Sequence, residues 1–355
     1  MKLSTNSLKF AKKISVFSFA ILLLSSCFNT GYTLPSVSGS QYEILVVMED
    51  SLWKLPAGRA LVDLLNRDMD DLPQPEPVMT VHQCTNAEFT DVLKPSRNLL
   101  ITEISDKYTS PKITYGKDKW AAPQAIVRIV APNDSSFAAT IKQYGKNILD
   151  YYIRMERERT IAFNKNYINQ TSKAEIEKLF GIQIDIPQGI SKTTIKKDFY
   201  WLTNDQAGVN QNIVIYSYPY TDKKTFTKEF LIEKRDSVMK ANLPGEIAGS
   251  YMGTELKWAQ PTFNEIWVNK GYCAELKGLW RMMGGAAMGG PFYSHTRLDE
   301  INQRVITMEV FLFAPGNKKR NPLRRLEAVL FSAKLPQEIN AIDEVSVVAD
   351  KKETK

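Results

Sequence analysis

Residues 124–155, QAIVRIVAPNDSSFAATIKQYGKNILDYYIRM, join a strand pattern directly to a helix pattern. The first seven residues are mostly apolar and β-branched, which predicts a buried strand. Asn133, Asp134 or Ser135 is placed to cap the helix that follows. Its apolar residues recur every three to four positions: Phe137, Ile141, Tyr144, Ile148, Tyr151 and Met155. A stripe of about five turns predicts a helix that packs across a sheet, or one that binds a partner.

The segment before this helix alternates between strand and helix patterns. Apolar runs at 42–48, 78–81 and 98–104 predict strands, and the periodic segments 55–69 and 85–93 predict helices. The Pro-rich stretch 72–77 excludes both and predicts a loop. We therefore expect an N-terminal α/β half over residues 41–170 that ends with the long helix.

Residues 171–348 predict a second half with more strands. Strand patterns at 198–202, 212–218, 263–268, 272–280 and 304–313 alternate with helix patterns at 172–181, 221–242 and 322–332. The order over 172–241 is similar to the antiparallel sandwich of the photosystem oxygen-evolving P-type proteins, which implies a binding or scaffold role. The expected fold class is α+β, with two halves that each have a mostly antiparallel or mixed sheet packed by helices.

The N-terminus has the pattern of an export signal. Four lysines precede an apolar run of eleven residues, 14–24, which is too short to span a bilayer as a mature helix. Leu24-Ser25-Ser26-Cys27 resembles the bacterial lipobox, and the resemblance implies cleavage after residue 26 and lipidation of Cys27 with diacylglycerol and an acyl chain such as palmitate. Residues 27–40 would then be a polar tether. An ordinary signal peptide or an N-terminal membrane anchor is the alternative.

The mature chain also resembles an uncharacterised family of Bacteroidetes lipoproteins, a domain of unknown function. The segments that carry this resemblance are 42–47, 72–77, 279–281, 288–292, 297–299 and 314–321. It implies a cell-envelope protein. Because Phe28 stands where an aspartate would favour the inner membrane, and no acidic surface-export cluster follows, we expect the periplasmic face of the outer membrane.

Composition narrows the possible functions. The signal holds four of the 46 Lys and Arg and none of the 39 Asp and Glu, so residues 27–355 have a formal net charge of +3. This near-neutral balance gives no support to nucleic-acid binding. Only His82 and His295 are present, so we expect no metal site and no cofactor. The expected partners are the membrane, through the anchor, and an envelope protein, glycan or lipid. The charged tail, 349–355, is expected to be disordered.

The glycine-rich segment 278–293 is the most unusual in the chain. Its glycines do not match a dinucleotide fingerprint or a phosphate-binding loop. The aromatic and basic residues around them, Trp280, Arg281, Phe292 and Tyr293, could form one wall of a ligand pocket. The alternative is a flexible hairpin connection whose aromatic side chains lie in the core.

A basic cluster lies where the last strand meets the last helix. It consists of Lys318, Lys319, Arg320, Arg324 and Arg325. Such a cluster could contact anionic headgroups, at about 1 kcal/mol for each charge near the surface. The alternative is a solvated loop.

Catalytic patterns are weak. Ser294, His295 and Asp299 contain the residue types of a nucleophile–base–acid triad, but no nucleophile-elbow motif surrounds Ser294. The acids Glu275, Asp299, Glu300 and Glu309 could supply a pair of catalytic carboxylates, or serve in ion pairs. We therefore expect a binding or assembly factor rather than an enzyme, with an envelope hydrolase acting on glycan, peptide or lipid as the alternative.

Two cysteines remain besides Cys27. In an oxidising periplasm Cys84 and Cys273 could form a disulfide between the halves. The alternative is a pair of buried free thiols that pack as small apolar groups.

Overall fold

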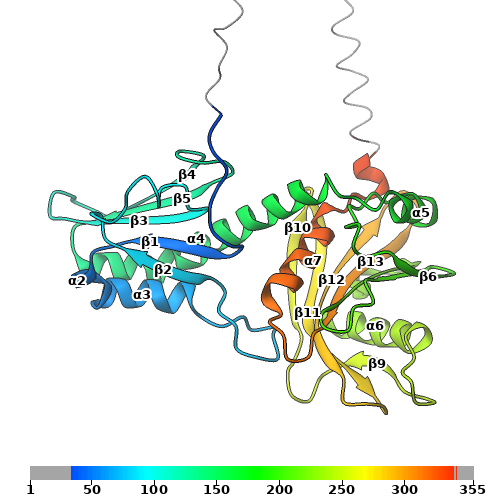
Figure 1. Cartoon of the computed structure of the whole chain (residues 1–355). Helices are drawn as coiled ribbons and strands as arrows, with labels where there is room; N and C mark the ends of the chain where they lie inside the picture. The colour runs from blue at the N-terminus through cyan, green and yellow to red at the C-terminus, as the bar shows by residue number, and fades with distance from the viewer. Residues whose placement is uncertain (1–32, 340, 342–355) are drawn as a thin grey trace, which may run out of the picture.

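The computed structural model describes residues 33–339 and residue 341. Two separate sheets lie side by side, and the long helix α4 (Asp134–Asn164) runs from one to the other (Figure 1). The expected signal peptide, Cys27 and the charged tail lie outside the described residues. The fold class is α+β, as predicted from the alternating patterns.

The first sheet is mixed, with the strand order β2-β1-β3-β5-β4. Its strands are β1 (Glu43–Val47), β2 (Thr80–Cys84), β3 (Asn98–Ile104), β4 (Lys112–Lys117) and β5 (Ala125–Ala131). Neighbouring strands run parallel, apart from β4, which is antiparallel to β5. Parallel strands are covered on both faces, which explains the unbroken apolar run 44–47 in β1, whereas the exposed Arg128 interrupts β5.

The two faces of this sheet have different covers. Short α2 (Asp50–Trp53) leads into α3 (Pro56–Leu65), and α3 packs with α4 on one face. Alternation along β1 turns Ile44 and Val46 to these helices and Leu45 and Val47 to the other face. Of the three residues considered as the cap of α4, Asn133 is the one that caps it, because its side chain accepts a hydrogen bond from the Ser136 amide.

The second sheet is antiparallel, with the strand order β10-β11-β12-β13-β8-β7-β6 and with β9 paired to β11. Its strands are β6 (Lys192–Lys196), β7 (Phe199–Thr203), β8 (Asn210–Pro219), β9 (Tyr251–Thr254), β10 (Thr262–Val268), β11 (Gly271–Met283), β12 (Gly289–Asp299) and β13 (Arg304–Phe313). The helices that pack on it are α5 (Gln170–Phe180), the 3₁₀ turn η2 (Lys223–Phe226) with α6 (Lys228–Asn242), and α7 (Arg320–Ser332).

Strand β13 shows how the second sheet divides its core. Met308 and Val310 belong to the apolar cluster under α5 and α7, whereas Phe311 belongs to the cluster under α6. Glu309 also faces α6, where its carboxylate accepts two hydrogen bonds from Arg235, at 2.9 and 2.8 Å. The period of two in this strand therefore places a buried ion pair on one face and, from Ile306 to Leu312, apolar side chains on the other.

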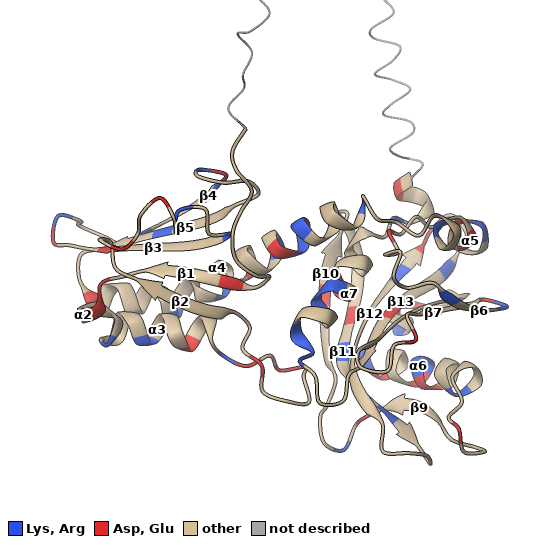
Figure 2. Cartoon of the chain, in the orientation of Figure 1, with Lys and Arg blue, Asp and Glu red and all other residues tan. Residues whose placement is uncertain are grey.

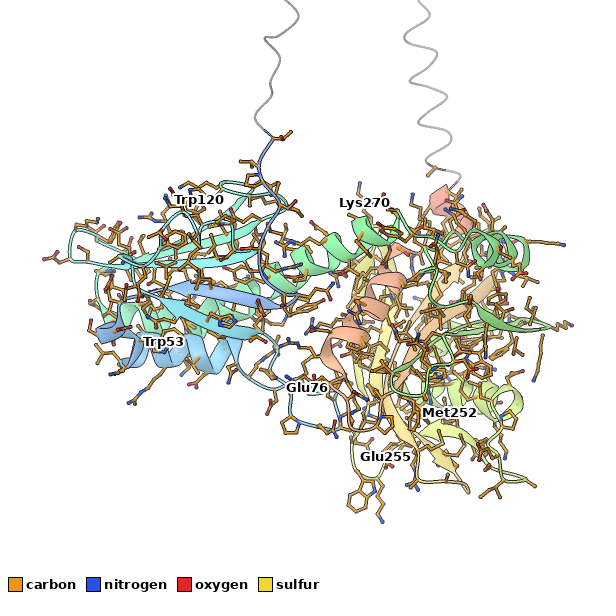
Figure 3. All side chains as sticks on the ribbon, viewed as in Figure 1. Trp53, Glu76, Trp120, Met252, Glu255 and Lys270 are labelled. Carbon is orange, nitrogen blue, oxygen red and sulfur yellow. The ribbon has the colours of Figure 1, made fainter. Side chains whose placement is uncertain are left out.

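The two sheets meet along a seam. It is formed by α4, α7 and the connection 66–79, which runs from α3 toward the second sheet and back to β2 (Figure 1). Figure 2 shows basic residues at the start of α7 close to acidic residues of this connection. The Pro-rich stretch 72–77 is a loop, as predicted, and it places the buried Glu76 between the halves (Figure 3).

Two helix predictions need correction. Residues 85–93 form turns, although the hydrogen bond of a capping box is made, from the Thr85 amide to Glu88 Oε2 at 2.8 Å. These turns pack Phe89 and Leu93 on the face of the first sheet that α3 and α4 do not cover. Helix α5 begins earlier than predicted, since Asn169, and not Ser172, is its cap.

The glycine-rich segment is mostly strand, so the flexible connection considered for it is confined to residues 284–288. Strands β11 and β12 extend through it and pair in a register that places Trp280 opposite Gly290. A Cβ atom at Gly290 would lie 2.0 Å from the Leu312 carbonyl oxygen, so the sheet needs glycine there for close approach of β13. Strands β4, β6 and β9, which are short and partly polar, were also missed.

Candidate functional site

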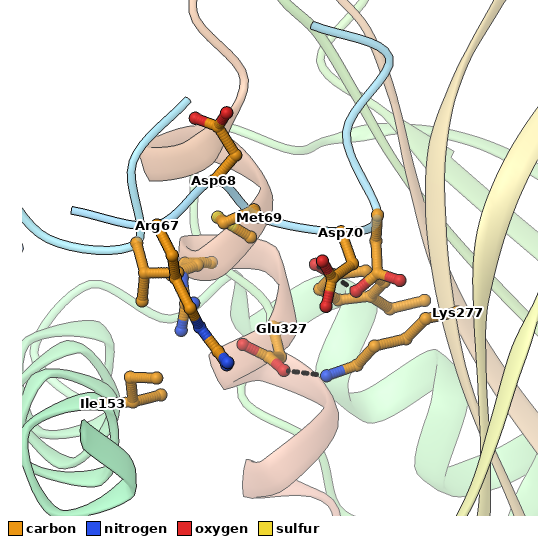
Figure 4. Close-up of a pocket in the computed structure, with 11 residues that line it drawn as sticks. Arg67, Asp68, Met69, Asp70, Ile153, Lys277 and Glu327 are labelled. Carbon is orange, nitrogen blue, oxygen red and sulfur yellow. Dashed lines mark hydrogen bonds and ion pairs between the residues drawn. The ribbon is translucent and has the colours of Figure 1, made fainter. Parts of the chain in front are cut away.

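A small pocket opens at the seam between the two halves (Figure 4). Its cavity volume is about 100 Å³. Connection 66–79 forms one side, and β11, β12 and α7 supply the rest, with Ile153 contributed by α4. The ionisable residues in its lining are Arg67, Asp68, Asp70, Asp71, Lys277, Tyr293, Arg324 and Glu327. This is the densest cluster of partly buried charges at the seam.

Lys277 is held between two carboxylates. Its Nζ lies 2.9 Å from Glu327 Oε1 and 3.1 Å from Glu275 Oε1. Burial lowers the pKa of Lys277, but the charges of Glu327 and Glu275 outweigh burial and hold that pKa above its ordinary value. A lysine that keeps its proton is a cation for binding or for structure, and not a nucleophile.

The two carboxylates stay ionised. Burial raises the pKa of Glu275, but the adjacent His295 and the charge of Lys277 outweigh it and lower the pKa to about 2. Burial likewise raises the pKa of Glu327, and the charges of Lys277 and Arg324 bring it below its ordinary value. Both groups therefore carry charge at neutral pH and leave no acid to donate a proton here.

His295 is fully buried beside this cluster. Its Nε2 lies 3.6 Å from Glu275 Oε1, beyond hydrogen-bonding distance, and neither ring nitrogen has a partner among the described residues. The ring packs edge-on against Phe331, with 4.7 Å between centroids. Burial lowers the pKa of His295 and exceeds the opposing effect of Glu275, so the ring is neutral at pH 7.

Two aspartates of the connection reach the second sheet. Asp71 accepts a hydrogen bond from the Tyr293 hydroxyl at 3.4 Å and another from Thr262 at 3.3 Å. Burial raises the pKa of Asp71. Asp70, its neighbour, is exposed and lies on the Lys277 side of the pocket in Figure 4.

The aromatic residues predicted to line a pocket are dispersed by the structure. Trp280 is 3% exposed, and its indole nitrogen donates to the Leu312 carbonyl at 3.1 Å. Phe292 is buried under the guanidinium of Arg235, and Arg281 is exposed, 3.2 Å from Glu255. Only Tyr293 lines the seam pocket. Three of the four residues thus belong to the core or the far end of the sheet.

The predicted basic cluster is divided in the same way. Lys319 and Arg324 are buried, and Arg320 is half-buried with its guanidinium bound to the Pro77 carbonyl at 2.8 Å. Lys318 and Arg325 remain exposed. The cluster cannot act as a continuous surface patch, because its central members hold the connection 66–79 against α7.

The triad residues do not come together. Ser294 and His295 are neighbours on β12, so their side chains point to opposite faces. Asp299 accepts from Arg304 at 2.9 Å and from Asn302 at 2.8 Å. Of the acids considered, Glu300 is exposed, and Glu275, Asp299 and Glu309 each have a basic partner.

The two cysteines are buried free thiols, the second of the two arrangements considered, and they do not form a disulfide. Cys84 ends β2 and Cys273 lies in β11, so they are buried in separate sheets. Burial raises the pKa of Cys84 to about 11 and that of Cys273 to about 12. Neither thiol is therefore activated as a nucleophile.

Lys277 and Glu327 were missed by sequence reasoning. The sequence does mark both residues weakly, because each is a charged residue among apolar ones in a buried element. Lys277 comes two residues after Glu275 on β11, and Glu327 lies between Leu326 and Ala328 on α7. Within residues 33–339, no group of three or more His, Cys, Asp or Glu side chains is placed to hold a metal ion. No helix in this same range is long and apolar enough to cross a membrane.

Two known family models match this chain, one in each half. Residues 37–165 match the family model "Domain of unknown function (DUF8532)", and residues 169–332 match "Domain of unknown function (DUF4837)". Both halves are similar to domains of unknown function. The matches change over where α4 ends at Asn164 and α5 begins at Gln170. A search of curated proteins found no match.

Proposed function

We propose that this protein is a lipid-anchored component of the cell envelope that binds or scaffolds a partner at the periplasmic face of the outer membrane. The observation that carries the proposal is the sequence of the leader, with its basic start, its short apolar run and Leu24-Ser25-Ser26-Cys27. Two or more acyl chains on one cysteine hold a protein stably at a bilayer, since each buried methylene contributes about 0.8 kcal/mol.

The position of the described ends supports this arrangement. Thr33, the first described residue, comes six residues after Cys27, and so short a segment spans at most about 20 Å. The first and last described residues leave the body on the same side (Figure 1). An anchor at Cys27 would therefore hold that side toward the lipid and turn the β9 end of the second sheet away from it.

The chemistry of the seam favours binding over catalysis. Its lysine keeps its proton, its two central carboxylates stay ionised, and its histidine is neutral and has no hydrogen-bond partner among the described residues. Such a cluster can hold a charged ligand or fix the two halves together, but it offers no activated nucleophile and no paired acid and base.

Metabolic labelling tests the anchor. Cells that express the full chain are grown with a clickable palmitate analogue, and the purified protein is scored for label. We expect label on the native chain and on Cys84→Ala, a matched change at a buried thiol, and none on Cys27→Ala. Label on Cys27→Ala would refute the proposal. Proximity labelling from the anchored protein would then identify the partner.

A further inference from the structure

Arg324 is a buried cation whose hydrogen-bonding capacity the described chain does not fully satisfy. It is 7% exposed, it lines the seam pocket, and its Nε has no hydrogen-bond partner among the described residues. Glu327, one turn further along α7, is 2.9 Å from Lys277 instead. A buried N–H group without an acceptor is costly, so a ligand oxygen in the pocket would complete the site.

The surroundings of Arg324 fix the direction from which a ligand approaches. Its Cζ lies 5.0 Å from the centroid of the Tyr42 ring, a cation–π distance, so an aromatic side chain occupies one side of the group. The hydrogen-bond donors of arginine lie in the plane of the group and match the two oxygens of a carboxylate. An edge-on carboxylate in the cavity is therefore the acceptor that best fits this residue.

Arg67 supplies a second cation. It lies in the connection 66–79, and Figure 4 shows its guanidinium turned toward Glu327 and the interior of the pocket. No carboxylate in the described part of the chain forms an ion pair with it, since Glu327 is paired with Lys277. A ligand carboxylate between Arg67 and Arg324 would pair with both.

The opposite side of the pocket carries negative charge. Asp70 and Asp71 line the cavity, and Figure 4 shows Asp70 on the side of Lys277, away from Arg67. A simple anion would meet these aspartates, and a simple cation would meet the arginines. A ligand with both charges satisfies each side and adds no net charge to the site.

We propose that the seam pocket binds a small zwitterion, an α-amino acid with a short side chain, through its carboxylate on Arg324 and Arg67 and its ammonium group on Asp70 and Asp71. The small cavity, about 100 Å³, favours a molecule the size of glycine or alanine over a larger amino acid. The inference rests on the binding role proposed above and not on the lipid anchor.

Titration calorimetry on the full chain in detergent tests the site. Glycine and alanine are the probes, and acetate and methylammonium are the single-charge comparators. We expect saturable binding of glycine or alanine at concentrations where neither comparator binds. Failure of both amino acids to bind, or equal binding of acetate, would overturn the proposal.

Three variants locate the binding on the pocket. Asp70→Asn changes an exposed residue and Arg324→Lys keeps the charge but loses the planar fork, so each should weaken binding about tenfold or more. Asp63→Asn is the matched control, because Asp63 is an exposed acid on the neighbouring helix α3 that does not line the pocket, and Figure 4 does not include it among the lining residues. Binding that is unchanged in both test variants would refute the site. The intact mass of the same sample shows whether Cys27 carries a lipid. The lipid anchor and the amino-acid site are therefore tested by separate measurements.

Discussion

Glu76 caps helix α7 from the other half of the molecule by accepting a hydrogen bond from the backbone amide of Lys319 at 2.6 Å. Its second oxygen accepts from the Arg320 amide at 3.0 Å. No side chain near α7 in sequence caps this helix end, so the carboxylate satisfies amides that would be unpaired and complements the positive end of the helix. A residue from the Pro-rich loop therefore completes an element 240 positions away and ties the halves together.

Removal of this cap should destabilise the protein. We expect Glu76→Ala to lower the free energy of unfolding by about 2 kcal/mol, because two charge-assisted hydrogen bonds are lost at a buried helix end. Glu76→Gln keeps one acceptor and should lose less. Urea unfolding provides the measurement, with Glu246→Ala as a control at an exposed acid. Equal stability of Glu76→Ala and the control would refute the cap.

Lys277 should be more important for stability than a surface lysine. Lys277→Met leaves the buried Glu275 and Glu327 without their shared cation and should cost about 3–5 kcal/mol. Lys146→Met breaks an exposed pair with Asp150 and should cost less than about 1 kcal/mol.

A second change distinguishes charge from packing at this position. Adding Glu327→Gln to Lys277→Met should recover part of the loss, since it removes one of the unpaired charges. A double variant no more stable than Lys277→Met would show that the ion pair is not the cause.

His295 should make stability depend on pH. Burial lowers the pKa of His295 in the folded state. As the pH falls below about 6.5, the histidine therefore binds a proton in the unfolded chain before it does so in the folded chain. This contribution is present above the unfolded pKa of about 6.5 and is lost as the pH falls below it. The groups that face the ring, Glu275, Lys277 and Glu327, keep their charges across this range.

Thermal unfolding between pH 7.5 and 5.5 measures the effect. His295→Phe should flatten the decline in melting temperature toward low pH, whereas His82→Phe, at the exposed histidine, should leave it unchanged. The same slope in all three proteins would contradict a buried neutral His295.

The planar guanidinium group of Arg235 should be required for full stability. It makes two hydrogen bonds to Glu309, both side chains are almost fully buried, and its guanidinium lies 3.8 Å from the centre of the Phe292 ring. Arg235→Lys keeps the charge but loses the paired geometry and the stacking, so we expect a loss of about 2 kcal/mol or more. Chemical denaturation against Lys240→Arg, an exposed change on the same helix, is the comparison. Full stability of Arg235→Lys would show that charge alone suffices.

Local patterns predicted the elements that bury long apolar stripes. Phe137, Ile141 and Ile148 are buried in α4, and the apolar run of β1 is a strand covered on both faces. Strand β6 was missed because all five of its residues are exposed, so no apolar alternation marks it. Its assignment depends on pairing with β7, which is a tertiary contact.

The seam was beyond reach because its partners are far apart in sequence. Lys277 and Glu327 are separated by 50 positions, and Tyr293 and Asp71 by 222. Spacing along one strand or helix carries no information on such pairs. Sequence reasoning named Tyr293 and Arg324 for two different sites, and the structure places both in one pocket.

The most direct test of the envelope proposal is the intact mass of the native protein recovered from fractionated cells. The proposal predicts that it is found in the membrane fraction, with a mass that corresponds to a chain beginning at Cys27 plus diacylglycerol and one acyl group. Native protein in the soluble cytoplasmic fraction, at the unmodified mass of all 355 residues, would contradict it.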